Sequence, residues 1–289
     1  MIAENPVAVS VARFVEMVQK INDADLEREW VWGSYRSEGV RFSFFRCYED
    51  LCELAVKLHQ ARMHSGRPIS EAEYILTQYH CAYMDLQAVL LGVGQQYVDT
   101  APTEGDWSVR ETIAHILGAD LGFYVSVKFA LDRYRLGLNP LVPIEDETWL
   151  KTAGFEGTEL DAIFAASFGE LQAFHQDLHR KILQDFRGIQ AEDLEKPSLY
   201  WEQEPLSLRF RLHRFDSHLR QHTVQVEKTL LALGCNPGES QRLLRLIYFA
   251  LAQVEGWMHP EGSNMESLVL DYSTRIEERN REIGEVLSR

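Results

Sequence analysis

Apolar residues recur at steps of three and four along most of the chain, which is the spacing of one face of an α-helix. No segment shows a convincing alternation of apolar and polar residues, as a half-buried strand would. The pattern therefore predicts an all-α protein, with four long helices in the centre of the chain and two on each side. The central helices are expected at about 70–97, 108–135, 158–186 and 206–233, and the flanking ones at 7–21, 44–62, 240–258 and 264–287.

Residues typical of helix ends support the predicted boundaries of the central helices. Ser70 precedes Glu73, and Ser108 precedes Glu111, at the spacing of a capping box. In this motif the hydroxyl and the carboxylate satisfy the first free amides of the helix. Gly234 follows the fourth central helix, as glycine commonly does at a helix C-terminus. The starts of the first and second central helices and the end of the fourth are therefore well marked.

The four central helices predict a four-helix bundle at residues 69–236. The remaining helices, in residues 1–68 and 237–289, come from both ends of the chain. We expect them to pair with each other as an accessory helical layer. This division agrees with the length of 289 residues, which predicts about two domains.

Composition and charge narrow the function classes. With 45% hydrophobic and 25% charged residues the chain is typical of a globular protein. Its formal net charge of −15 argues against nucleic acid or an anionic membrane as a partner, because polyanions would be repelled. The longest purely apolar stretch near a helix, 88–94, is far shorter than the roughly 20 residues that cross a bilayer. The start lacks the features of a secretory signal, and the four cysteines lack CxxC spacing. We expect a cytoplasmic protein with free thiols and a small-molecule ligand.

Candidate chemistry lies on the fourth central helix, where two histidines are one turn apart. His218 and His222 stand at i and i+4 and so share one face, with Gln225 at i+7 on the same face. Imidazoles in a bundle core need polar partners. A divalent metal is one such partner, since neutral imidazole ligates it well. Hydrogen-bonded histidines without a metal are the alternative, because this spacing by itself is weak evidence.

Three further histidines lie in the second and third predicted central helices. His175 and His179 form a second pair at this spacing, one position off the apolar stripe of the third central helix. Asp177 and Arg180 stand beside them, so we interpret this pair as a solvated flank. His115 lies in an apolar run of the second central helix, where a lone histidine is typically a core residue.

Two motifs stand on the second and fourth central helices. Their residues are Trp107, Ser108, Glu111 and His115 in the first, and His218, His222 and Gln225 in the second. The first reads Trp-Ser-x-x-Glu with a histidine four residues on, and the second reads His-x-x-x-His-x-x-Gln. Together they resemble the DinB/YfiT-like superfamily of bacterial four-helix bundles, over about residues 69–236. Gln221 replaces the middle histidine of the family pattern, which is not a ligand, and Val224 replaces a frequent glycine. These departures leave the ligand set intact but do not support a particular subfamily.

The resemblance implies a divalent metal site formed by His115, His218 and His222. Zinc or nickel is the expected ion, with iron or manganese as alternatives. It also implies two chemistries, which are transfer of a low-molecular-weight thiol to a small electrophile and hydrolysis. Three histidine ligands leave open positions on the ion, as in catalytic zinc sites. A non-catalytic binding or sensor protein, with or without metal, is the alternative, and the sequence identifies no catalytic residue.

Four further residues are candidates for supporting this site. Carboxylates or amides usually fix the tautomer of ligating histidines, and the candidates for this role are Asp85, Asp216 and Gln225. Trp107 is a candidate for a pocket wall, with packing at the helix entry as the alternative. Members of the superfamily often dimerise through bundle faces. The resemblance thus leaves two alternatives open: a homodimer through such a face, or terminal helices that cover the face instead.

Overall fold

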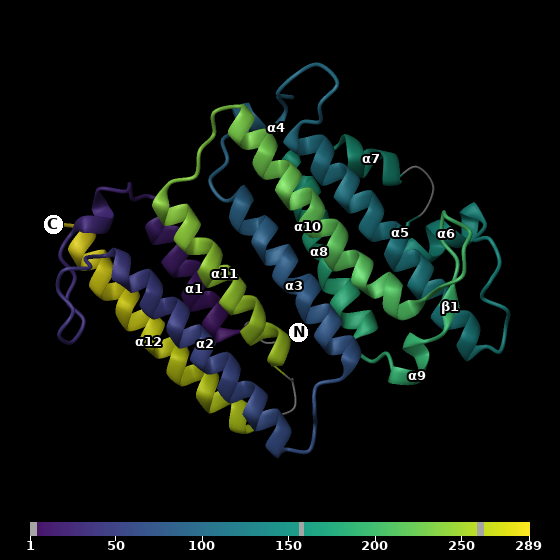
Figure 1. Cartoon of the computed structure of the whole chain (residues 1–289), viewed down its shortest axis with the longest axis horizontal. Helices are drawn as coiled ribbons and strands as arrows, with labels where there is room; N and C mark the ends of the chain where they lie inside the picture. The colour runs from purple at the N-terminus through teal and green to yellow at the C-terminus, as the bar shows by residue number, and fades with distance from the viewer. Residues whose placement is uncertain (1–4, 156–158, 259–262) are drawn as a thin grey trace. The chain divides into compact units, whose positions relative to one another are not determined.

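The computed structural model describes residues 5–155, 159–258 and 263–289. The chain forms two compact units (Figure 1). The terminal unit consists of residues 1–69, 87–92 and 236–289, and the central unit consists of residues 70–86 and 93–235. That the helices of the chain ends form a layer on the bundle stays a prediction.

The central unit contains the four long helices of a bundle, as predicted. These are α3 (Glu71–Leu90, up to residue 86), α5 (Val109–Arg135), α8 (Phe168–Phe186) and α10 (Leu208–Ala232). Phe215 on α10 is fully buried, and its ring centroid lies 5.1 Å from that of Tyr79 on α3. The corresponding distances are 5.6 Å to Phe123 on α5 and 6.3 Å to Phe186 on α8. One aromatic side chain thus joins all four helices in the core.

Serine caps fix where the long helices of this unit begin. Ser108 and Ser167 each form a complete capping box with the glutamate three residues later. The Ser207 hydroxyl accepts a hydrogen bond from the amide of Phe210 at the start of α10. The cap at Ser167 divides the predicted third helix into α7 (Glu159–Ala165) and α8. The predicted start at Thr158 lies outside the described residues.

The first central helix is shorter than predicted. It ends at Leu90, and Gly92 follows with a φ of +73°, in the left-handed region that glycine adopts without strain. The short helix α4 (Gln95–Val98) accounts for the rest of the predicted range.

Short elements connect the long helices. α6 (Asp146–Ala153) follows α5, and α9 (Ala191–Leu194) follows α8. Between α9 and α10 the chain makes a small antiparallel hairpin of β1 (Pro197–Ser198) and β2 (Leu206–Ser207), in a segment for which the sequence predicted no strand. Pro197 pairs with Ser207, and Ser198 pairs with Leu206. The loop of this hairpin carries side chains that become important at the candidate site.

The terminal unit joins the two ends of the chain. Its helices are α1 (Pro6–Val18), the 3₁₀ turn η1 (Asp25–Glu27), α2 (Arg41–His64), α11 (Glu239–Trp257) and α12 (Ser263–Leu287). The hydroxyls of Ser10 on α1 and Ser273 on α12 are 2.8 Å apart. α2 packs against both α11 and α12. Helices from opposite ends of the sequence therefore share one core. The connection between the two C-terminal helices, at 259–262, lies outside the described residues.

Among the described residues, α5 alone is long and apolar enough to cross a membrane by length and composition. However, 67% of its most apolar stretch is buried inside the protein, as is usual for the core helix of a bundle. All four cysteines are free thiols, and Cys47 and Cys81 are buried.

Candidate metal centre

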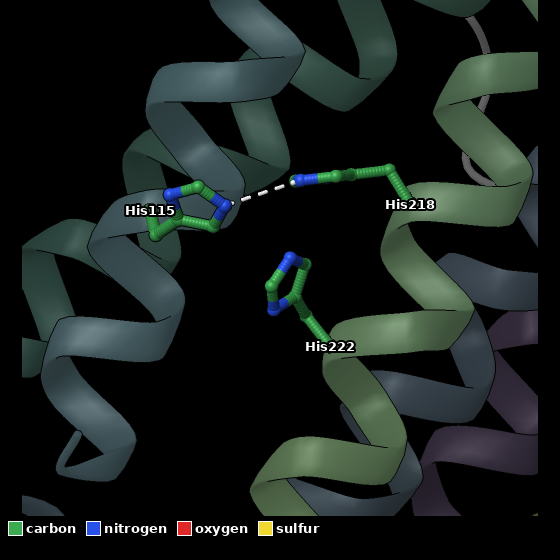
Figure 2. Close-up of side chains that lie close together, drawn as sticks. All are labelled: His115, His218 and His222. Carbon is green, nitrogen blue, oxygen red and sulfur yellow. Dashed lines mark hydrogen bonds between the residues drawn. The ribbon is translucent and has the colours of Figure 1, made fainter. Parts of the chain in front are cut away.

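Three histidines converge from two helices of the central unit. His115 comes from α5, two turns after the cap at Ser108, and His218 and His222 come from successive turns of α10 (Figure 2). His218 and His222 are buried, whereas His115 is exposed. The structure therefore brings together the three residues that the sequence proposed as ligands. We refer to them as the three-histidine cluster.

The spacing of the cluster fits a small divalent ion. One ligand nitrogen from each ring lies within 4.8 Å of the other two. The Nε2 atoms of His115 and His218 are 3.2 Å apart, the contact drawn in Figure 2. Two nitrogens bound at about 2.1 Å to one tetrahedral ion would be about 3.4 Å apart. The donor set of three imidazoles also suits zinc and nickel.

Gln225 fixes the orientation of one ring in the cluster. The Nδ1 atom of His222 lies 2.8 Å from the side-chain oxygen Oε1 of Gln225, one turn further along α10. An amide oxygen only accepts hydrogen bonds, so Nδ1 carries the proton and donates it. The lone pair of His222 is then on Nε2, as metal ligation requires.

Burial keeps the other two rings neutral. It lowers the pKa of His218 to about 3, and the neighbouring His222, His115 and Arg214 add to this shift. His115 is exposed, but the part of its ring that the protein covers loses solvent, which lowers its pKa, with a further contribution from His222. Both imidazoles are therefore uncharged at neutral pH, which is the form that binds metals.

Acidification is expected to destabilise the metal-free protein. Folded His218 stays neutral down to about pH 3, whereas an unfolded histidine takes up a proton near pH 6.5. Below about pH 6.5 the unfolded state therefore binds more protons, and this histidine lowers stability by up to about 1.4 kcal/mol per pH unit. Urea unfolding with a chelator, at about pH 7 and about pH 5.5, measures the effect. His218→Ala should reduce this pH dependence, and His213→Ala, an exposed position on α10, should not. An unchanged slope in His218→Ala would contradict the prediction.

The other residues proposed to support the site are Trp107, Asp216 and Asp85, and they differ in whether they contact the three-histidine cluster. The Trp107 ring lies 5.0 Å from the His115 ring and 6.4 Å from the His222 ring, and Trp107 is 41% exposed. Asp216 accepts a hydrogen bond from Arg220 at 2.7 Å. Asp85 lies half-buried on α3. Among the described residues, neither carboxylate belongs to the group of mutually close metal-ligand atoms.

A cavity of about 700 Å³ adjoins the cluster, which is within the range of small-molecule sites. His115 and His218 form part of its wall, so the cavity reaches two of the three rings. Most of the remaining wall is apolar or aromatic. These wall residues are Gly118, Ala119, Phe123, Tyr200, Trp201, Leu206 and Phe210.

Three charged residues complete the cavity wall, and the sequence analysis missed them. Arg211 is buried and forms an ion pair with Glu202 from the hairpin loop. Arg214 is half-buried, one turn before His218. The spacing of Arg211, Arg214 and His218 at i, i+3 and i+7 is a signal that the sequence does contain. Nothing local indicates that the hairpin loop brings Glu202 to the same cavity.

The second histidine pair is not a solvated flank, so that interpretation was wrong. His175 and His179 are 1% and 2% exposed. The Nε2 atom of His175 lies 3.2 Å from Asp120 on α5, and His179 Nε2 lies 2.9 Å from Nδ1 of His80 on α3. The Tyr79 hydroxyl donates to the same Asp120 oxygen at 2.8 Å. Polar partners on the neighbouring helices allow these imidazoles to be buried.

Comparisons with known proteins identify relatives of the central part of the chain. A sequence model of the DinB superfamily matches residues 78–226. A Bacillus cereus protein (strain ATCC 10987 / NRS 248) named "Putative metal-dependent hydrolase" is 24% identical over 143 residues, which is 49% of this chain and 75% of the relative. A protein of Bacillus thuringiensis subsp. konkukian with the same description has the same identity and coverage.

A solved structure, YfiT from Bacillus subtilis, is described as "a probable metal-dependent hydrolase with an unusual four-helix bundle topology". It is 16% identical, and the match has a TM-score of 0.37 and covers 73% of this chain and 99% of that chain. The segment that matches the superfamily contains all three histidines of the cluster and just over half of the chain. This protein therefore belongs to the DinB superfamily.

Proposed function

We propose that this protein is a metal-dependent hydrolase that acts on a small molecule. His115, His218 and His222 would hold a divalent ion, with zinc or nickel preferred over iron or manganese. The observation that carries the proposal is the convergence of three imidazoles, two of which lie in the wall of a cavity large enough for a small molecule. The names of the Bacillus relatives support the same reaction class.

The residues around the cluster have distinct roles in this proposal. A divalent ion with three histidine ligands supplies Lewis acidity and activates water at neutral pH. Gln225 holds His222 in its ligating tautomer. Arg214 offers a guanidinium to an anionic group of the substrate, because the other cavity arginine, Arg211, is already paired with Glu202. The aromatic residues of the wall offer apolar contact surface to the substrate.

Gln225 is expected to be a positioning residue for the metal. Gln225→Ala removes the acceptor of the His222 Nδ1 proton, so the ring is free to rotate and to change tautomer. Metal affinity should fall about 10- to 100-fold, as for other outer partners of ligating histidines. Competition with a chromophoric chelator measures the change. Gln225→Glu keeps an oxygen acceptor and should restore most of the affinity, whereas equal affinity in Gln225→Ala and the wild type would contradict this role.

The proposed function is tested by metal content and turnover together. Elemental analysis of the purified protein identifies the ion. Metal-free protein, reloaded with zinc or nickel in turn, is then assayed against a panel of small esters and amides. We expect hydrolysis that requires the ion and is lost when it is removed.

The same assay separates the competing functions. Turnover of an electrophile only when bacillithiol, mycothiol or glutathione is added would indicate a thiol transferase instead. If the metal-loaded protein turns over none of these substrates, the result would favour a binding or sensor role. A cytoplasmic location, a homodimer, and the expected absence of nucleic-acid or membrane partners stay predictions that rest on composition and resemblance.

A further inference from the structure

The wall of the cavity beside the three-histidine cluster carries one positive charge in excess. Its charged residues are two arginines, Arg211 and Arg214, and one carboxylate, Glu202. The buried Arg211 forms an ion pair with Glu202 and also donates from Nε to the Ser198 hydroxyl at 3.3 Å. Arg211 and Glu202 therefore balance each other, and the charge that remains is that of Arg214.

The guanidinium of Arg214 is accessible and forms no ion pair among the described residues. Its Nη1 donates to the exposed Ser217 hydroxyl at 3.3 Å. Its other two nitrogens have no partner in the described part of the chain, and neither is buried. Asp216, two residues further along α10, is paired with Arg220. Arg214 thus offers free donors to a ligand in the cavity.

Large aromatic side chains of the same wall are also accessible. Trp201 is 79% exposed and Phe210 is 44% exposed, and both line the cavity. The guanidinium carbon of Arg214 lies 5.8 Å from the ring centroid of Phe123, and that ring lies 5.7 Å from the His218 ring. Exposed apolar surface at a concave site is typical of ligand binding. The cavity therefore combines aromatic surface with one unpaired cation, close to the candidate metal centre.

The hairpin loop, residues 199–205, is held against α5 and so forms a fixed part of this wall. A Cβ atom at Gly122 would lie 2.0 Å from the hydroxyl oxygen of Tyr200, so only glycine allows the loop to approach α5 this closely. The guanidinium carbon of Arg211 lies 5.7 Å from the Tyr200 ring centroid, and its Nη2 donates to the Glu204 carbonyl at 3.5 Å. A wall that is fixed in advance binds a ligand at a lower entropic cost.

We propose that the substrate class of this cavity is a small carboxylate with an aromatic body. Arg214 binds the carboxylate, and Phe123, Trp201 and Phe210 contact the body. A carboxylate is favoured over a phosphate monoester because its single charge matches one unpaired guanidinium, whose fork also fits two carboxylate oxygens. This inference rests on the proposed function and narrows its substrate.

Isothermal titration of the full chain with phenylacetate tests the proposal. Two matched probes accompany it: phenylacetamide, which has the ring without the charge, and acetate, which has the charge without the ring. We expect saturable binding of phenylacetate that is at least about tenfold tighter than that of either matched probe. No saturation by phenylacetate up to about 10 mM, or equally tight binding of a matched probe, would overturn the proposal.

The titration is run on the protein as purified and again after its metal has been removed. Binding through Arg214 needs no ion, so phenylacetate should bind in both cases. Binding only to the metal-loaded protein would place the carboxylate on the ion and overturn the proposal. Because this readout needs neither metal nor turnover, its failure is distinct from failure of the proposed function, which would appear as an absence of hydrolysis by the metal-loaded protein.

A variant locates the carboxylate within the cavity. Arg214→Gln should weaken phenylacetate binding about tenfold or more and leave the weaker phenylacetamide binding unchanged, because only the partner of the charged group is lost. Arg220→Gln changes an arginine of the same helix that is paired with Asp216 and lies outside the cavity wall, so it should bind both probes as the wild type does. Wild-type phenylacetate affinity in Arg214→Gln, with circular dichroism showing a folded chain, would also overturn the proposal.

Discussion

Replacing both His218 and His222 by alanine is expected to abolish stoichiometric metal binding. The double variant keeps a single ring of the cluster, His115, which is the exposed one. Loss of an outer hydrogen-bond partner alone typically costs about 10- to 100-fold in metal affinity, so the loss of two ligands should exceed that range. Elemental analysis after dialysis, together with chelator competition, should give about one ion per chain in the wild type and none in the variant.

The control for this experiment is His213→Ala on the same helix. His213 is exposed, and it is not one of the clustered metal-ligand residues, so this variant should retain the ion and rule out a general effect of removing a histidine from α10. Circular dichroism should show that each variant keeps its helices. An unchanged metal content in the double variant would refute the assignment of the site, whatever reaction the protein catalyses.

Replacing Asp120 by alanine is expected to cause the largest loss of stability among single substitutions in the polar core. Asp120 is fully buried on α5 and contacts both the Tyr79 hydroxyl and the His175 ring through one oxygen. Its removal leaves two buried polar groups without this partner, at about 1–3 kcal/mol each. Urea unfolding followed by circular dichroism measures the loss in the free energy of unfolding.

Two comparisons make this prediction specific. Asp120→Asn keeps an oxygen acceptor at the same place and should recover much of the lost stability. Asp216→Ala removes an aspartate on α10 that pairs with the partly exposed Arg220, and such pairs contribute only about 0–1 kcal/mol. If Asp120→Ala were no more destabilising than Asp216→Ala, the buried network would have no structural role.

The sequence predicted most helices well because local chemistry marks their ends. The Ser108 capping box places the start of α5, and Gly234 follows the end of α10, so the two histidine-bearing helices lie close to their predicted ranges. The predicted third central helix is too long because the apolar periodicity continues across Ser167, whose side chain caps the start of a new helix. Periodicity reports the buried face of a segment but does not detect a break between helices that share that face.

The sequence also reports the contacts of a histidine only where they lie within its own helix, which explains why one histidine pair is placed correctly and the other is not. The i, i+4 spacing places His218 and His222 on one face, and the family motif adds His115, so the residues of the candidate centre could be named from the sequence. His175 and His179 have the same spacing and were assigned to the surface, since their polar neighbours along the chain suggested solvent. Their partners, Asp120 and His80, belong to other helices.

The sequence by itself determined the helical class, the ends of the principal helices and the three histidines that the structure brings together. These properties depend on spacing within one helix and on caps a few residues long, which are local. The tertiary structure decided which polar residues are buried, how the hairpin loop brings Glu202 to Arg211, and that Asp50 and Arg279 form an ion pair. The physical reason is that burial and electrostatic pairing depend on residues far apart in the chain, and only packing determines which of them become neighbours.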